Sequence, residues 1–476
     1  MAQLHEVEVQ AQSPERLDGL IGPERAERFA TMARATRDLL AGRTVINVSS
    51  TATGGGVAEL LQTLLAYARG VGVDARWFVI EGSPDFFEIT KRIHNHLYGT
   101  VGDGGPLGGA ARDTYEAVLR GNADDLLALV QPGDVVLLHD PQTAGLAATV
   151  RRAGGVVVWR CHVGVDSPNA EVELAWDWLR PYLADVDAFV FSRRAFAPPW
   201  VDDAALHVIA PSIDPFSAKN FEMPPTEALR VLRYVGLVAG TDHPAPAPFV
   251  RRDGSHGRID RHADILQTGP PPPSDVPLVV QASRWDMLKD MQGVMAGFAE
   301  HVDGAGDAHL VLAGPSVSGV ADDPESGQVL DECAEAWRRL PHAQRTRVHL
   351  ACTPMRDPDE AAAIVNALQR HAAVVVQKSL AEGFGLTVAE AMWKRRPIVA
   401  SALGGIADQI VDGRHGLLVD DPTDLVSFGA AVRRLLDDGE LAAELGANAR
   451  DRANEEFLPD RHLEQWAALI AQAVGT

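Results

Sequence analysis

The sequence predicts an α/β protein built from two doubly wound domains, each with a parallel sheet covered by helices on both faces. Two observations support this prediction. Short apolar runs alternate with longer helix-like segments over most of the chain, and a proline-rich stretch separates two comparable halves. Strand–helix–strand alternation on this scale is typical of parallel sheets with helical crossovers. The chain has 476 residues, which suits two or three domains of ordinary size.

The predicted strands are near-continuous runs of Val, Ile, Leu and Phe, as expected for parallel strands that are buried on both faces. In the first half we predict strands at 44–50, 75–80, 134–139, 156–161 and 188–191, and helices at 57–69, 112–130, 143–152 and 171–183. The second half repeats the pattern, with strands at 278–282, 309–312, 348–351, 373–377 and 397–400. Ligands of open α/β sheets bind beyond the carboxyl ends of the strands, so we expect a site in a cleft between the domains.

The proline-rich stretch sets the predicted domain boundaries. It ends in four consecutive prolines, which favour an extended chain over helix or sheet. We expect an N-terminal domain at 1–215, a linker or insertion at 216–276, a C-terminal domain at 277–455 and a final helical segment at 456–476. Basic residues cluster at 251–262 inside the insertion, which indicates either a solvated segment or a flap that helps to hold an anionic ligand.

The composition excludes several classes of protein. With 43 basic and 65 acidic residues the net charge is −22, which argues against nucleic acid or an anionic membrane as a partner. Three widely spaced cysteines form neither a disulfide framework nor a metal-binding knuckle. No apolar stretch is long enough to span a membrane, and the N-terminus lacks a secretory pattern. We therefore expect a cytoplasmic protein with small-molecule partners, which could form a homodimer.

A glycine-rich turn, residues 54–56, follows the first predicted strand and leads directly into a helix. Backbone N–H groups at such a helix start bind anions, which the net charge of the protein would otherwise repel. The dinucleotide pattern fails because Glu59 stands where its third glycine should be, and the P-loop pattern fails because no lysine follows the glycines. The turn therefore indicates an anion-binding loop or, alternatively, a plain tight turn.

Polar residues also follow two other strands of the first half. Asp140 comes after the strand at 134–139, and His162 comes after the strand at 156–161. With two such strand ends in one half, ligand contact and purely structural roles are both open. The sequence has neither a helical His-x-x-x-His pattern nor an Asp-x-Asp pair in a suitable place. We expect no tightly bound cofactor or metal. Mg²⁺ would have at most a stimulatory effect, and no side chain of the site would coordinate it.

In the second half, Arg284 and Lys289 follow the strand at 278–282. A guanidinium fork and an ammonium group together suit a diphosphate, although two solvated cations remain the alternative. Later, Glu382 stands at a glycine-rich turn and Glu390 lies eight positions further, about two helical turns along. Either carboxylate could accept hydrogen bonds from ligand hydroxyls, beside the bare N–H groups of the helix start.

These features resemble the retaining GT-B glycosyltransferases of the glycogen-synthase-like clan. The shared features are Ser283-Arg284 with Lys289, the Glu382 and Glu390 pair, and the N-terminal glycine loop. Within the clan, the sequence is most similar to the glycosyl-transferring trehalose synthases. This closer resemblance rests on motifs at 47–59, 75–82, 139–142, 160–162 and 377–393, and on Lys91 with His94-Asn95.

The resemblance implies a GT-B fold, with two Rossmann-like domains facing across a cleft and a last helix, 460–474, that crosses back onto the first domain. It implies a retaining enzyme that moves glucose from a nucleoside-diphosphate glucose, such as UDP-glucose or ADP-glucose, to glucose, forming α,α-trehalose. By the same resemblance the catalytic residues would be Arg284, Lys289, Glu382 and His162. The donor would be bound by Gly55, Gly56, Gly383, Phe384, Gly385, Leu386, Thr387 and Glu390, and the acceptor by Glu81, Asn95 and Asp140.

Three other functions remain open at this stage. A trehalose phosphorylase of the same fold would use inorganic phosphate in place of the nucleoside diphosphate. A related glucosyltransferase would use a different sugar or polyol acceptor. A sugar-nucleotide binding protein without turnover would have less need of both Arg284 and Lys289.

Overall fold

The computed structural model describes residues 3–53, 55–240, 245–302, 307–317 and 325–475. Gly54 of the glycine loop, residues 241–244 of the predicted linker or insertion, and residues 1–2, 303–306, 318–324 and 476 of the other predicted segments lie outside the described residues. The chain forms two compact units. The first unit comprises Met1–Ser212 and Phe457–Thr476, and the second comprises Ile213–Glu456.

The first unit contains a seven-stranded sheet in the order β1-β3-β2-β4-β5-β6-β7, in which only β1 is antiparallel to its neighbour. Its strands are β1 (Leu4–Glu6), β2 (Val45–Ser49), β3 (Ala75–Ile80), β4 (Val135–His139), β5 (Val156–Cys161), β6 (Ala188–Phe191) and β7 (Leu206–Val208). Because β2, β4 and β5 are parallel neighbours, their carboxyl ends lie along one edge of the sheet.

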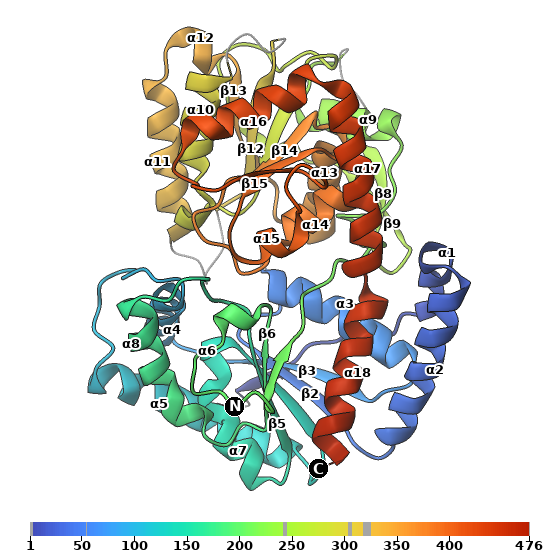
Figure 1. Cartoon of the computed structure of the whole chain (residues 1–476), viewed down its shortest axis with the longest axis vertical. Helices are drawn as coiled ribbons and strands as arrows, with labels where there is room; N and C mark the ends of the chain where they lie inside the picture. Colours follow the sequence, from blue (N-terminus) through green and yellow to red (C-terminus); the bar gives the residue numbers. More distant parts are fainter. Residues whose placement is uncertain (1–2, 54, 241–244, 303–306, 318–324, 476) are drawn as a thin grey trace. The chain divides into compact units, whose positions relative to one another are not determined.

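Helices cover both faces of this sheet (Figure 1). They are α1 (Asp18–Ile21), α2 (Pro23–Leu39), α3 (Gly56–Gly70), α4 (Pro84–Leu97), α5 (Gly109–Leu129), α6 (Asp140–Thr143), α7 (Ala147–Arg152), α8 (Ala170–Leu179) and α18 (Pro459–Gly475). Consecutive residues of β2 enter different cores, as the period of a strand requires: Val45 packs in the core with α3 and α18, whereas Ile46 packs in the core with α4, α5 and α8.

The C-terminal helix α18 packs on α2 and α3 within the first unit, as Figure 1 shows. Its apolar residues Trp466, Leu469 and Ile470 are buried in the core beside α3. At its start, Asp460 is only 1% exposed and accepts hydrogen bonds from Nε and Nη2 of Arg25 on α2, at 3.0 and 2.6 Å. A buried carboxylate requires such a partner, so this ion pair fixes the helix start.

The second unit contains a second seven-stranded sheet, in the order β10-β13-β12-β11-β14-β15-β16, with only β10 antiparallel to its neighbour. Its strands are β10 (Asp264–Leu266), β11 (Leu278–Ala282), β12 (His309–Pro315), β13 (Val348–Thr353), β14 (Val374–Gln377), β15 (Ile398–Ser401) and β16 (Leu417–Val419). Its helices are α9 (Pro225–Val235), α10 (Met291–His301), α11 (Glu325–Arg339), α12 (His342–Arg345), α13 (Pro358–His371), α14 (Leu386–Trp393), α15 (Gly404–Gln409), α16 (Leu425–Asp437) and α17 (Gly439–Glu456).

The segment at 216–276 differs from the expected linker, because it belongs to the second unit and contains regular structure. It forms α9, the antiparallel hairpin of β8 (Ala247–Val250) and β9 (His256–Ile259), and the edge strand β10. Its arginines bind carboxylates at the start of α13: Arg251 pairs with Asp357, and Arg261 pairs with the fully buried Glu360. These contacts make the basic cluster an anchor for the hairpin, rather than a solvated segment.

The Arg25–Asp460 pair gives a direct stability test. We expect Arg25→Ala to lower the free energy of unfolding by about 2–3 kcal/mol, because it leaves a buried carboxylate without its cation. Arg28→Ala is the matched control, since Arg28 is 60% exposed in its pair with Glu464 and should change stability by less than about 1 kcal/mol. Chemical denaturation of both variants measures the difference. Equal effects would show that the buried pair does not fix α18.

Candidate active site

The predicted diphosphate and sugar residues of the second unit come together at the carboxyl ends of two neighbouring parallel strands. Lys289 lies in a short 3-10 helix (Met287–Lys289) after β11, and Glu382 lies in the loop after β14, which pairs with β11. The Lys289 Nζ atom lies 2.6 Å from Glu382 Oε2, and the two side chains are 16% and 9% exposed. The structure therefore brings two predicted catalytic residues into direct contact.

Buried polar side chains hold this ion pair in place. Gln281, in β11, donates from Nε2 to the carbonyl of Lys289 at 2.7 Å. Ser379 donates from Oγ to Glu382 Oε2 at 3.3 Å. Lys378 is 1% exposed and bonds both the carboxylate of Asp290, the residue after Lys289, and the carbonyl of Pro422. Both partners of the pair are thus fixed by the strand ends that carry them.

Arg284 remains accessible in the same strand end. Its side chain is 43% exposed and its Nη2 lies 3.5 Å from Asp286 Oδ2. The other carboxylate oxygen of Asp286 accepts from the backbone N–H of Leu288 at 2.8 Å, so it caps the turn that leads to Lys289. Arg284 and Lys289 therefore both lie in the short loop that follows β11.

The glycine-rich turn at 383–385 has a backbone that demands glycine. Gly385, the N-cap of α14, has a φ of 87°. Close packing reinforces the requirement nearby, because a Cβ on Gly404 would lie 1.8 Å from the carbonyl oxygen of Glu382. The amides of Leu386 and Thr387 lie in the first turn of α14, where N–H groups have no partner within the helix. The turn can therefore present N–H groups to an anion or a sugar hydroxyl.

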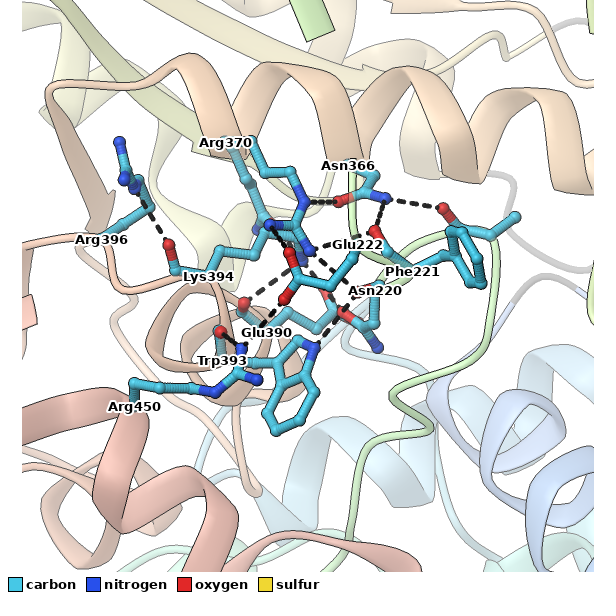
Figure 2. Close-up of polar contacts among 12 residues, drawn as sticks. Asn220, Phe221, Glu222, Asn366, Arg370, Glu390, Trp393, Lys394, Arg396 and Arg450 are labelled. Atoms are coloured by element: carbon cyan, nitrogen blue, oxygen red, sulfur yellow. Dashed lines mark hydrogen bonds and ion pairs between the residues drawn. The ribbon is translucent and has the colours of Figure 1, made fainter. Parts of the chain in front are cut away.

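Glu390 lies further along α14 and is 2% exposed (Figure 2). Its Oε1 lies 3.5 Å from Nζ of Lys219, in the segment that precedes α9. The next turn carries Lys394, which is also buried and whose pKa is lowered by that burial to about 7. Glu390 is thus a buried carboxylate with a lysine beside it, rather than a solvated helix residue.

In the first unit, the ends of β2, β4 and β5 carry a chain of polar contacts. His139 Nε2 lies 3.0 Å from Asn47 Oδ1, and His139 Nδ1 lies 3.3 Å from His162 Nε2. Burial lowers the pKa of His139 to about 3, and burial together with the nearby Arg160 holds the pKa of His162 well below its usual range. Both imidazoles are therefore neutral at physiological pH, and neither is suited to act as a general acid.

Arg160 joins this chain to the C-terminal helix. Its side chain is fully buried, its Nε donates toward the ring of His162, and its Nη2 donates to the carbonyl of Ile209 at 3.0 Å. The guanidinium also lies over the ring of Trp466 on α18, 5.4 Å from the ring centroid. The position of His162 consequently depends on α18 as well as on β5.

Asp140 contacts His162 through the backbone. Its Oδ1 accepts from the N–H of His162 at 2.7 Å, and its backbone has a φ of 63°, in the left-handed region. Desolvation raises the pKa of this half-buried carboxyl to about 7. One carboxyl oxygen is thus held by the backbone, which leaves the other to meet a ligand.

The glycine loop leads into α3 as predicted, but Gly55 does not have the positive φ that a tight glycine turn would allow. Gly55 is the N-cap residue and has an extended φ of −144°. A Cβ on Gly55 would meet no atom within 4 Å, so the surrounding chain does not require glycine there. That open space is consistent with the close approach of a ligand to Gly55 and to Gly56, the first residue of α3.

The other two predicted acceptor residues lie apart from this contact. Glu81 follows β3, has a 60% exposed side chain and lies 3.6 Å from His5. Asn95 lies on α4, is 7% exposed and packs against Gly102 of the following loop. Within the residues that the structure describes, no hydrogen bond or ion pair is found that links either of them to Asp140 or His162.

Several residues of these clusters were missed by sequence reasoning. Lys219 and Gln409 lay in no recognised motif, although Gln409 donates from Nε2 to the carbonyl of Phe384 at 2.5 Å and so holds the glycine turn. Lys378 lay in the motif at 377–393 but was not assigned a role. His139 stood at a recognised strand end and was not assigned a role.

Among the described residues, no group of three or more His, Cys, Asp or Glu side chains is arranged to hold a metal ion. In the same part of the chain, no helix is long and apolar enough to cross a membrane.

Comparison with known proteins identifies relatives of the whole chain. Residues 47–198 match the family model of the trehalose synthase N-terminal domain, and residues 353–452 match that of glycosyl transferases group 1. The trehalose synthase of Pyrococcus horikoshii is 33% identical over 460 residues, covering 96% of this chain and 95% of the relative. That of Rubrobacter xylanophilus is 34% identical, covering 92% of each chain. The trehalose phosphorylase of Pleurotus pulmonarius is 25% identical, covering 86% of this chain and 54% of its own length.

Solved structures show the same fold. Sucrose-phosphate synthase from Thermosynechococcus elongatus superposes with a TM-score of 0.62 at 17% identity, covering 90% of this chain and 98% of that chain. The E. coli trehalose-6-phosphate structure bound with UDP-2-fluoro glucose superposes with a TM-score of 0.65 at 16% identity, covering 91% and 99%.

The raised pKa of Asp140 predicts a specific pH dependence of stability. The folded state keeps a proton on Asp140 between about pH 4 and 7, whereas the unfolded state has lost it, so stability falls as pH rises through this window. Asp140→Asn should flatten this dependence, and the variant should gain stability relative to the wild type as pH rises. Thermal unfolding at four pH values between 4 and 7 measures the effect, with Asp38→Asn, an exposed residue, as control. Parallel pH profiles for wild type and Asp140→Asn would contradict the raised pKa.

Proposed function

Because the chain belongs to the trehalose synthase family of GT-B glycosyltransferases, we propose that it transfers glucose from a nucleoside-diphosphate glucose to free glucose, with retention, to form α,α-trehalose. The observation that carries the proposal is the Lys289–Glu382 pair with Arg284 in the same loop. It supplies two cations for a diphosphate and one carboxylate for sugar hydroxyls, at the strand ends where such ligands bind.

Arg284 and Lys289 hold the donor diphosphate in this proposal and stabilise the negative charge that develops as it leaves. Removal of one such donor typically slows an enzyme by about 10²–10³-fold. Glu382 accepts hydrogen bonds from the donor sugar, and the amides of Gly383, Phe384, Gly385, Leu386 and Thr387 lie beside sugar and phosphate. Lys289 then contacts both the phosphate and Glu382, so a single ammonium group couples sugar binding to diphosphate binding.

The proposed transfer follows a front-face route. The bond from the acceptor oxygen to the anomeric carbon forms on the face from which the bond to the phosphate oxygen breaks. The acceptor proton passes to the leaving phosphate oxygen, so no enzyme carboxylate has to act as a nucleophile. Glu382 fits this scheme because Lys289 and Ser379 already occupy one of its oxygens.

In the first unit, we assign His162 to a place near the donor sugar and Gly55 and Gly56 to donor phosphate and acceptor. Because the imidazole of His162 is neutral and held by His139 and Arg160, its role is to orient rather than to exchange protons. Asp140 is the acceptor-binding residue with the strongest structural support. Glu81 and Asn95 remain candidates for acceptor hydroxyls.

A phosphorylase is the second candidate, because a trehalose phosphorylase is among the relatives. The deciding experiment incubates the protein with UDP-, ADP- or GDP-glucose, or with glucose 1-phosphate, and a panel of sugar and polyol acceptors, and identifies the products by NMR. We expect α,α-trehalose and a nucleoside diphosphate. Trehalose formed only from glucose 1-phosphate, with release of phosphate, would indicate a phosphorylase. Nucleotide-sugar binding without any product would indicate a binding protein.

Lys289→Ala tests the diphosphate role. We expect the kcat for nucleotide release to fall by about 10²-fold or more, because the leaving group loses its fixed cation. Arg434→Ala, at an exposed position on α16, is the control and should retain wild-type kcat. A wild-type rate in Lys289→Ala would remove Lys289 from the site.

Chelation tests the absence of a required metal. Because the proposed site neutralises the diphosphate with Arg284 and Lys289, we expect most of the activity to remain in excess EDTA. Steady-state rates before and after dialysis against EDTA measure this. Complete loss that is restored by Mg²⁺ would show that a metal takes part of the role given to these side chains.

A further inference from the structure

A short segment before α9, residues 218–222, is held against helices α13 and α14 of the second unit, and we name it the strap (Figure 2). Asn366 on α13 donates from Nδ2 to the carbonyls of Ala218 and Phe221, at 3.1 and 2.8 Å. Arg370, one turn later on α13, donates to the carbonyls of Asn220 and Phe221, at 3.1 and 3.0 Å. These bonds fix the backbone of the strap along α13.

The strap is also bound to the end of α14, the helix that carries Glu390. Trp393 donates from Nε1 to the carbonyl of Asn220 at 3.2 Å. Lys394 is 3% exposed, and its Nζ contacts Asn220 Oδ1, Gln369 Oε1 and the carbonyl of Glu390 at 2.9, 2.8 and 3.2 Å. Three oxygen acceptors match the three N–H donors of an ammonium group. The strap and α14 therefore behave as one assembly.

This assembly places a cation at a buried carboxylate. The side chain of Lys219 is 22% exposed and its Nζ lies 3.5 Å from Oε1 of Glu390, whose side chain is 3% exposed. A carboxylate that is so deeply buried remains ionised only beside a positive charge or strong hydrogen-bond donors. The Lys219 side chain is partly exposed, so this cation lies between solvent and the buried carboxylate.

We propose that Lys219 is a positioning residue for the nucleotide: it keeps Glu390 ionised and oriented so that this carboxylate accepts hydrogen bonds from the ribose hydroxyls of a nucleoside diphosphate. The inference rests on the proposed function, to which it adds the donor-binding role that the family resemblance implies for Glu390. In this proposal the strap takes part in donor recognition, although it lies in the segment expected to be a linker or insertion.

Ribose-deficient nucleotides test this role. Titration calorimetry would measure the binding of UDP, ADP and their 2′,3′-dideoxy counterparts to the wild type, Lys219→Met, Lys219→Arg and Glu390→Gln. We expect the wild type to prefer the ribonucleotide, and Lys219→Met to bind it about tenfold more weakly while its affinity for the dideoxy form stays unchanged. Lys219→Arg should recover part of the preference. Adding Lys219→Met to Glu390→Gln should have little further effect, because both act on one contact.

Steady-state kinetics of the variants give a second measurement. Lys219→Met should raise the donor KM about tenfold with kcat nearly unchanged, because the affected contact is far from the bond that breaks. Arg434→Met on α16 removes an exposed cation and is the control for net charge. Thermal unfolding shows whether each variant is folded, and Lys219→Gln replaces Lys219→Met if the latter is not.

Three results would overturn the inference. Unchanged ribonucleotide binding in Lys219→Met would exclude any role in recognition. Equal weakening for ribo- and dideoxyribonucleotides would show that Lys219 only supports the fold. A wild type that binds none of the nucleotides would overturn the proposed function together with the inference, whereas the first two results leave the proposed function intact.

Discussion

The proposed donor site depends on one ion pair, between Lys289 and Glu382, which connects the ends of two neighbouring strands. Each partner reaches its place only through buried polar groups: Gln281 holds the backbone of Lys289, and Lys378 holds the residue after it. Burying charges is unfavourable unless they are paired and hydrogen-bonded, so the strand ends must be correctly formed before this pair can exist. In a protein with a net charge of −22, such a local arrangement is also what an anionic donor requires.

The first unit uses a different electrostatic solution. Its polar chain through Asn47, His139 and His162 contains neutral imidazoles. The buried cation Arg160 contacts His162 as well as Ile209 and Trp466. Asp140, at the same edge of the sheet, favours its neutral form because of desolvation. Neutral groups that only orient a ligand suit an uncharged sugar, whereas the cationic loop of the second unit suits an anion.

Sequence reasoning predicted the two sheets and their strand ends well, because buried parallel strands leave short apolar runs that end in polar residues. It missed α2 and α4 as helices, although Lys91 and Asn95 of α4 belonged to a recognised motif, and it took 216–276 for a linker or insertion outside the second domain. Proline content misled there: prolines sit at the start of α9 and within strand β8, where they are tolerated. Lys219 was missed because its partner Glu390 is 171 positions away, and only the folded chain brings the two side chains together.

We propose above all that the loop of Arg284 and Lys289 binds the diphosphate of the donor. A crystal structure of the protein with bound UDP or ADP tests it most directly. The account predicts phosphate oxygens within hydrogen-bonding distance, about 3 Å, of the Arg284 guanidinium and of Lys289 Nζ. A diphosphate bound elsewhere on the protein, with Lys289 contacting only Glu382, would contradict it.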